Sequence, residues 1–224
     1  MRATSLALLL TVSTLAFAPL AQAHDVEDHG PKKGDVEQTH DLQDFDAIEV
    51  RGVYRLNVTA GEDYSVFTSG QPKEVDRMKV YVEDGVLILD QNKDKKKKSR
   101  DRKGVWVDIS LPSLNEIEIT GVGTGDITGV DSDYFDLDVS GVGELTIEGR
   151  CGALDTSMRG VGSIDARGLE CEDADVSLKG VGEVTLFASE SVEVSAKGIG
   201  SVDVYGKPKS VEKSKGFLSG VTVH

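Results

Sequence analysis

Five acidic residues take the same place in successive repeats of the chain and are the first candidates for chemistry. Each lies five residues before a Gly-Val-Gly or Gly-Ile-Gly triplet, and together they are Glu116, Asp136, Asp155, Asp175 and Glu193. Carboxylates stacked at strand spacing repel one another unless they point into water, accept turn N–H groups or share a cation. This acidic column is a candidate strip for Ca²⁺ or a cationic ligand. Calcium loops also need backbone carbonyls and clustered acids, so the pattern favours solvent-facing carboxylates, and we predict no metal and no cofactor.

The sequence shows no catalytic set of residues. His224 is the one histidine in the predicted folded region, and each Gly-x-Gly precedes a strand rather than a helix, which is unlike a phosphate loop. A face rich in Asp and Glu supplies carboxylate pairs by chance, so such pairs do not identify glycoside chemistry. We therefore predict a non-enzyme. The alternative is a polysaccharide lyase or hydrolase on a β-helix, which would show a deep groove with converging carboxylates and a base.

The triplets themselves carry an apolar and a basic series. The middle residues are Val122, Val142, Val161, Val181 and Ile199, here named the aliphatic stripe. The residues just before the later triplets are Arg159, Lys179 and Lys197, here named the basic column, with Lys215 expected to extend it. If the strand runs straight, the stripe is exposed and is the best candidate binding face; if the chain bends at the glycines, the stripe points inward. The aggregation risk of an exposed apolar ladder favours the inward arrangement.

The two cysteines of the chain occupy equivalent positions in adjacent repeats. Cys151 and Cys171 each lie nine residues before a Gly-Val-Gly triplet. Parallel coils would bring such positions together at a spacing that a disulfide can bridge, and an exported protein meets an oxidising compartment. We predict a disulfide rather than two stacked free thiols.

A repeat of 18 to 20 residues, marked by the triplets, extends from residue 113 to residue 224. Within each unit apolar residues alternate, which excludes helical repeats and indicates stacked parallel strands. The positions four and two before the first glycine, and four and six after it, form the predicted core. The fold class is all-β: a right-handed parallel β-solenoid of about five to six coils, closed by an incomplete coil over 207–224.

Residues 45–112 precede the repeats and are predicted to form an antiparallel β part of the same domain. Alternating residues favour strands, and Asp84-Gly85 between two apolar runs predicts a hairpin with a tight turn. The basic run 92–103 contains no aromatic residue, so it favours a solvated loop over an anion or polysaccharide contact.

The N-terminus predicts export. Residues 6–20 are apolar, too short to span a bilayer, and Ala21-Gln22-Ala23 suits a signal peptidase, so residues 1–23 are a predicted signal peptide cleaved after Ala23. Residues 24–44 hold little apolar material and are predicted to be a disordered acidic leader. No later segment is a transmembrane candidate. A net charge of −14 argues against nucleic acid as a partner and against anionic lipid.

The order of these parts resembles the bacterial "head GIN domain", a family named as a putative auto-transporter adhesin. The resemblance covers residues 44–224 and rests on Phe45-Asp46-Ala47-Ile48-Glu49-Val50, Asp84-Gly85, Leu111-Pro112, the serial Gly-x-Gly triplets and Gly206-Lys207-Pro208. It implies a β-helix-like fold in an exported envelope protein of the periplasm or the exterior. That family often has a small polar middle residue, as in Gly-Ser-Gly, whereas this chain has Val or Ile. We therefore predict a non-catalytic envelope or surface protein that presents a solenoid face to a glycan or a surface protein.

Overall fold

A computed structural model of the protein describes residues 34–91 and 104–224, which belong to the unit formed by residues 31–224. One helix and thirteen strands make up this part of the chain. They are β1 (Val36–His40), β2 (Ala47–Ala60), β3 (Ser65–Gly70), α1 (Pro72–Val75), β4 (Met78–Glu83), β5 (Val86–Gln91), β6 (Val105–Leu111), β7 (Glu116–Val139), β8 (Val142–Met158), β9 (Val161–Leu178), β10 (Val181–Ala196), β11 (Ile199–Tyr205), β12 (Ser210–Lys215) and β13 (Ser219–Val223).

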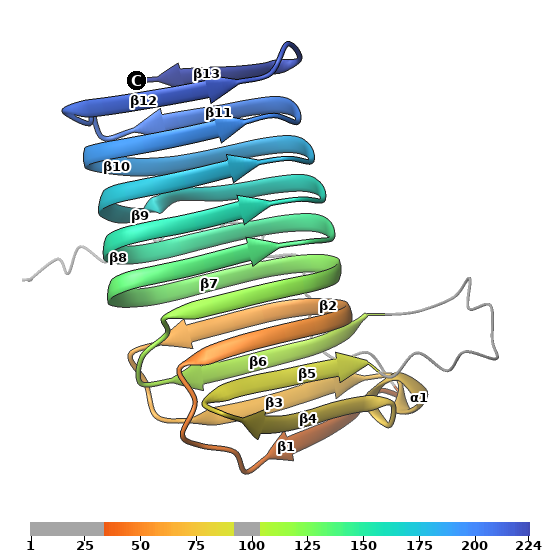
Figure 1. Ribbon diagram of the computed structural model, residues 1–224. Coiled ribbons are helices and arrows are strands. Elements are labelled where there is room, and N and C mark those ends of the chain that lie inside the picture. The colour runs from red at the N-terminus through yellow and green to blue at the C-terminus, as the bar shows by residue number, and fades with distance from the viewer. Residues whose placement is uncertain (1–33, 92–103) are drawn as a thin grey trace, which may run out of the picture. The chain divides into compact units, whose positions relative to one another are not determined.

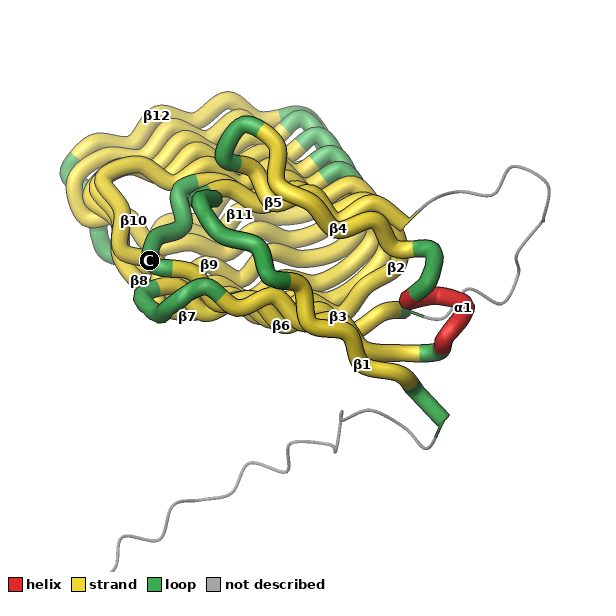
Figure 2. Tube along the Cα trace, turned by 90° about the horizontal axis from the view of Figure 1, so that it is seen from below, coloured by secondary structure: helices red, strands yellow, loops and turns green. Residues whose placement is uncertain are grey.

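The long strands β7 to β10 each follow one coil of a parallel β-solenoid, as predicted, with about five coils in all. The triplets stack in register: Val142 pairs with Val161, Val161 with Val181, and Val181 with Ile199. Figure 1 shows the coils rising from green β7 to blue β11, and Figure 2 looks along the stack at the overlying coils. On either side of a bulge in the middle of each coil, this register places the residues of one repeat beside their equivalents in the next.

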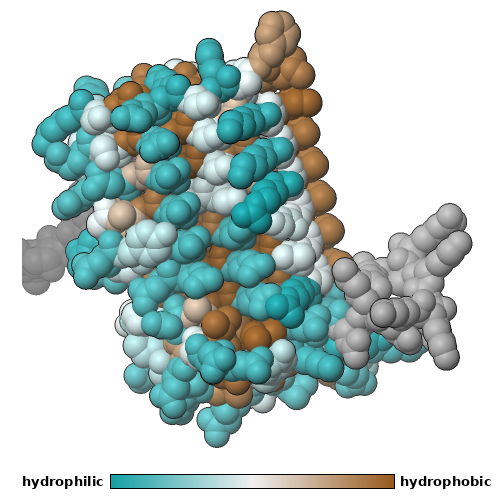
Figure 3. Space-filling model, viewed as in Figure 1, coloured by the Kyte–Doolittle hydropathy of each residue, from teal (hydrophilic) through white to brown (hydrophobic). Residues whose placement is uncertain are grey.

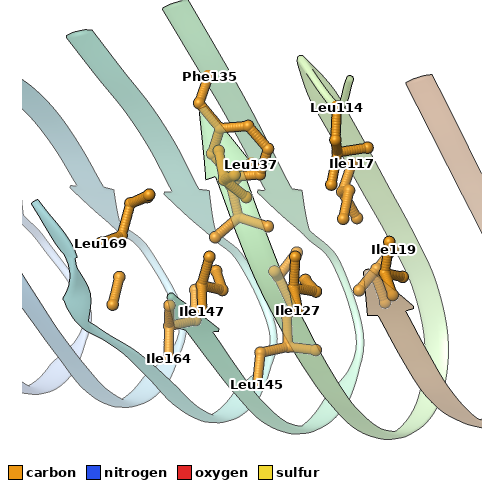
Figure 4. Close-up of a cluster of buried hydrophobic side chains, with 14 of the residues drawn as sticks. Leu114, Ile117, Ile119, Ile127, Phe135, Leu137, Leu145, Ile147, Ile164 and Leu169 are labelled. Atoms are coloured by element: carbon orange, nitrogen blue, oxygen red, sulfur yellow. The ribbon is translucent and has the colours of Figure 1, made fainter. Parts of the chain in front are cut away.

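The predicted core positions are buried. Ile117, Leu137 and Val176 are 0 % exposed, and so are Ile127, Ile147 and Leu186. Figure 4 shows several of these side chains meeting in the interior between opposite walls of the coils. Since one coil cannot bury its own apolar row, the core forms only when neighbouring coils stack.

β2 differs from the antiparallel arrangement predicted for residues 45–112. It pairs in parallel with β7 on one side and with β5 and β6 on the other, and its Gly52-Val53-Tyr54 stacks on Gly121-Val122-Gly123. β2 is therefore a solenoid coil. The remaining pairs, β1 with β3, β3 with β6, and β4 with β5, are antiparallel. The hairpin prediction is confirmed: Asp84 and Gly85 take φ values of 51° and 81° in the turn between β4 and β5.

Part of the predicted disordered leader is a strand. β1 pairs antiparallel with β3, and the His40 Nε2 atom lies 2.9 Å from the Thr68 hydroxyl oxygen. Four of its five residues are exposed, so backbone pairing with a sheet edge orders this segment in place of apolar burial. The predicted signal peptide over residues 1–23, residues 24–33 and the basic run 92–103 lie outside the described residues.

β12 and β13 form the last coil, on β10 and β11. Lys213 stacks on Val194. Lys215, which was expected to extend the basic column, stacks on Ala196 and so stands one residue short of it. In the described part of the chain, no helix is long and apolar enough to cross a membrane.

Candidate functional site

The aliphatic stripe lies on the outside of the solenoid. Val122, Val142, Val161, Val181 and Ile199 are exposed by 49 %, 51 %, 51 %, 44 % and 50 %. The inward arrangement that aggregation risk favours is therefore wrong. Figure 3 shows the stripe as a brown single file along one edge of the solenoid.

The glycines of each triplet lie where the chain bends and successive coils approach each other closely. A Cβ added to Gly160 would lie 1.8 Å from the Gly141 carbonyl oxygen, and one added to Gly162 would lie 1.8 Å from that of Gly143. Both glycines thus turn their missing side chains onto the backbone of the previous coil, at distances that no real Cβ tolerates. β8 ends at Met158, the chain bends at Gly160, and β9 begins at Val161. The chain therefore does bend at the triplet, as the inward arrangement assumed, but Val161 lies on the outer side of the bend, where it is 51 % exposed. The close approach of successive coils accounts for the two glycines.

The stripe extends beyond the residues that the triplets identify. At one end Val53 stacks on Val122 and is half-buried, and at the other Leu218 and Phe217 are exposed by 60 % and 101 %. Val53 was missed because β3 to β6 separate β2 from the repeats. The closing coil over 207–224 was predicted, but Leu218 was not assigned to the stripe because Gly216-Phe217-Leu218 has lost the triplet form. The sequence signal that could have identified these positions is an apolar residue close to a single glycine, as in Gly52-Val53 and Gly216-Phe217-Leu218.

The basic column stands beside the stripe, and the two form opposite sides of a shallow groove of about 670 Å³ over four coils. The groove is lined by Ser140, Gly141, Val142, Arg159, Gly160, Val161, Lys179, Gly180, Val181, Lys197, Gly198 and Ile199. An Arg159 guanidinium nitrogen lies 2.8 Å from a carboxylate oxygen of Asp138. Lys179 and Lys197 are exposed, and neither has a salt bridge to any other described residue.

The other flank of the stripe alternates in charge from coil to coil. Two residues after the stripe, the stacked positions are Thr124, Glu144, Ser163, Glu183 and Ser201. The next outward positions are Asp126, Thr146, Asp165, Thr185 and Asp203. Each coil thus carries one carboxylate here, and like charges never stack directly. The two flanks of the stripe therefore differ: one is cationic and the other is mildly anionic.

The acidic column is a real stack and is longer than predicted. Asp136, Asp155, Asp175 and Glu193 pair in register, and Glu212 of β12 continues them. Glu116 is the first member of the column. Next to it, the Asp136 N–H donates a hydrogen bond of 2.9 Å to the carbonyl oxygen of Asn115. Among residues 34–91 and 104–224, no group of three or more His, Cys, Asp or Glu side chains is arranged to hold a metal ion.

Three members of the acidic column have a raised pKa. Partial burial raises the pKa of Glu116, Asp136 and Asp155, and in each case the next carboxylate in the stack adds to the rise. Tyr134 lies on the same face, where burial and nearby carboxylates raise the pKa of its phenol. A tyrosine acting as a base for a polysaccharide lyase would need the opposite shift. These groups form a regular row instead of a converging acid and base.

Cys151 and Cys171 are joined by a disulfide, with their Cα atoms 4.5 Å apart. They stack directly on adjacent coils β8 and β9, and both are buried. Each cysteine lies nine residues before a triplet, about half a repeat away. The bond therefore links two coils without contributing to the groove.

These features agree with a family match. The model of the family described as "Putative auto-transporter adhesin, head GIN domain" matches residues 44–208. The chain belongs to this family. The match spans most of the chain, including β2, the inserted strands β3 to β6 and all of the Gly-Val-Gly coils.

The chain is similar to several solved structures, one of which has a TM-score high enough to show the same fold. A protein from Bacteroides fragilis described as a "putative adhesin" is 26 % identical, covers 87 % of this chain and 99 % of its own, and has a TM-score of 0.68. A "putative lipid binding protein" and a "putative adhesin", both from Parabacteroides distasonis, are 15 % and 17 % identical, with TM-scores of 0.47 and 0.46. They cover 87 % and 86 % of this chain, and 98 % and 97 % of their own. The chain matches none of the curated proteins with which it was compared.

Proposed function

We propose that this head GIN domain is an exported, non-catalytic envelope or surface protein that binds its ligand through the aliphatic stripe and the flanking basic column. The family is described as a "Putative auto-transporter adhesin" and the similar Bacteroides fragilis structure as a "putative adhesin", which suggests a binding role and an exported or surface location. The predicted signal peptide, with cleavage after Ala23, supports the same location.

The observation that carries the proposal is the exposure of the stripe. Five aliphatic side chains in single file, each about half-exposed, contribute little to the core yet invite aggregation. The fold requires only the two glycines of each triplet, because a polar residue between them could also face water. A functional contact is the physical reason for keeping Val or Ile at all five positions.

The shape of the site favours binding over catalysis. The groove beside the stripe is shallow and repeats from coil to coil, with lysines, glycines and aliphatic residues along it. Catalysis needs a unique constellation that excludes water, whereas a repeating face offers the same weak contact many times.

The test compares binding by the exported chain and a triple variant, Val142→Thr, Val161→Thr and Val181→Thr, on whole cells and on a glycan array. Threonine keeps the shape and the strand preference of valine but removes the apolar surface. The matched control is Val211→Thr, on β12 outside the stripe, where the valine is 37 % exposed. We expect the triple variant to lose binding and the control to retain it. A folded triple variant that binds as well as the wild type would refute the proposal.

A further inference from the structure

We propose that the groove between the aliphatic stripe and the basic column binds a linear polysaccharide that carries carboxylate groups, laid along the solenoid axis. The inference deepens the proposed function and rests on it, because it names the class of ligand for the same face. Three observations carry it: the unmatched lysines, the axial repeat of the groove and the difference between the two flanks of the stripe.

Lys179 and Lys197 are exposed cations without a carboxylate partner, as are Lys73, Lys79 and Lys207 elsewhere in the described chain, but these two stack on adjacent coils beside Arg159. Arg150 pairs with Asp131 at 2.5 Å, Arg167 with Asp165 at 2.8 Å, and Lys209 with Glu190 at 2.6 Å. Lys179 and Lys197, within the described residues, have no such carboxylate, although they lie on adjacent coils. Cations stacked at about 4.8 Å repel each other, and an anion bound along the stack would relieve this repulsion. The stack therefore favours external negative charge.

The groove repeats along its length. The same elements, a cation, a glycine and an aliphatic side chain, recur on each of the coils that begin at Gly160, Gly180 and Gly198, and the lining reaches Val142 on the coil below. A ligand that fits one coil fits the next after a shift of about 4.8 Å. A polymer of like units satisfies this geometry, and each added unit strengthens binding by raising the effective concentration of the next.

The two walls of the groove match the two sides of a sugar acid. The aliphatic wall offers contact to the C–H face of a sugar ring, and the lysine ammonium groups offer charge-assisted hydrogen bonds to carboxylates. Gly160, Gly180 and Gly198 line the groove between the two walls and present only backbone there.

The anionic flank favours a single thread over a flat surface. A planar anionic membrane resting on the stripe would meet Glu144 and Glu183 on the far flank. A thread in the groove contacts the basic side alone. A second copy of the chain is also disfavoured, because a stable interface buries roughly 800 Å² on each partner, more than a single file of half-exposed aliphatic side chains supplies.

The experiment is titration calorimetry of the exported chain with oligogalacturonates and oligomannuronates of increasing length. The neutral control is the methyl-esterified galacturonate series, which keeps the rings and removes the charge. We expect affinity to rise with length until the oligomer spans the groove, to fall with added salt, and to be lost with the methyl esters. Lys179→Gln with Lys197→Gln should weaken binding about tenfold, whereas Lys209→Gln, outside the groove, should not.

Three results would overturn the inference. In the first, neither uronate series binds, while the variant at Val142, Val161 and Val181 still loses cell binding. The proposed function would then stand, but this ligand class would be wrong. Binding to phosphatidylglycerol vesicles but not to the oligosaccharides would indicate a membrane. A doubled mass in light scattering that the same triple variant abolishes would indicate a second copy. Cell binding that survives the triple variant would instead refute the proposed function itself.

Discussion

Threonine substitutions on the two faces of strand β9 separate the role of the stripe from that of the core. Val161 of the stripe is 51 % exposed, whereas Val176 of the core is 0 % exposed. In Val176→Thr the new hydroxyl is buried, and an unpaired buried hydroxyl costs about 1–3 kcal/mol. In Val161→Thr the hydroxyl reaches water, so we expect the free energy of unfolding to change by no more than about 0.5 kcal/mol.

The measurement is urea unfolding at constant pH with the disulfide intact. Far-UV circular dichroism follows the strands, and the fluorescence of Trp106, the single tryptophan, tests whether the transition is cooperative. Both substitutions lie in one coil, so the solenoid's dependence on neighbouring coils affects them equally. If Val161→Thr costs as much as Val176→Thr, the stripe contributes to the fold, and its exposure no longer argues for a ligand.

Three other predictions concern stability. Thr156 lies in the core ladder between Leu137 and Val176, and its buried hydroxyl has no partner among the described residues, so Thr156→Val should stabilise the protein by about 1 kcal/mol in the same urea assay. Because the pKa of Asp155 is raised above its ordinary value of 3.8, the folded state binds protons more readily than the unfolded state. Its contribution to stability is therefore present at about pH 4 and lost as the pH rises, so Asp155→Asn should raise Tm at about pH 7 and reduce the wild-type gain on acidification. Replacing both cysteines by serine opens a link between residues 20 apart and should cost about 3 kcal/mol in urea unfolding.

Each of these has a result that would contradict it. A Thr156→Val protein that is less stable than the wild type would show that the hydroxyl has a partner. An Asp155→Asn protein that gains as much in Tm on acidification as the wild type would show that Asp155 does not carry this pH dependence. Equal stability of the oxidised and reduced wild-type protein would show that the disulfide does not constrain the unfolded chain.

The repeat register could be predicted because the sequence spacing of the triplets determines it. Once the triplets are aligned, strand alternation places Ile147 and Val176 inside and stacks Cys151 on Cys171, and no tertiary information is needed. The orientation of the stripe could not be predicted in this way. It depends on which side of the bend at Gly160 the Val161 side chain lies, and sequence spacing does not contain this.

The two ends of the solenoid were harder to predict for a different reason. β2 joins the stack through backbone pairing with β7, but the strands inserted after it remove the 18 to 20 residue spacing on which the repeat depends. β1 is ordered by an edge strand in spite of an exposed, polar sequence, so composition alone predicts disorder. In both cases a partner distant in sequence determines the structure.

Methyl NMR of the valine-labelled protein, titrated with the longest oligouronate that binds, tests the binding face most directly. If the ligand binds at the stripe, we expect the methyl signals of Val142, Val161 and Val181 to shift and those of buried Val176 and Val194 to stay unchanged. Shifts confined to valines away from the stripe, such as Val192 beside the acidic column, would contradict it.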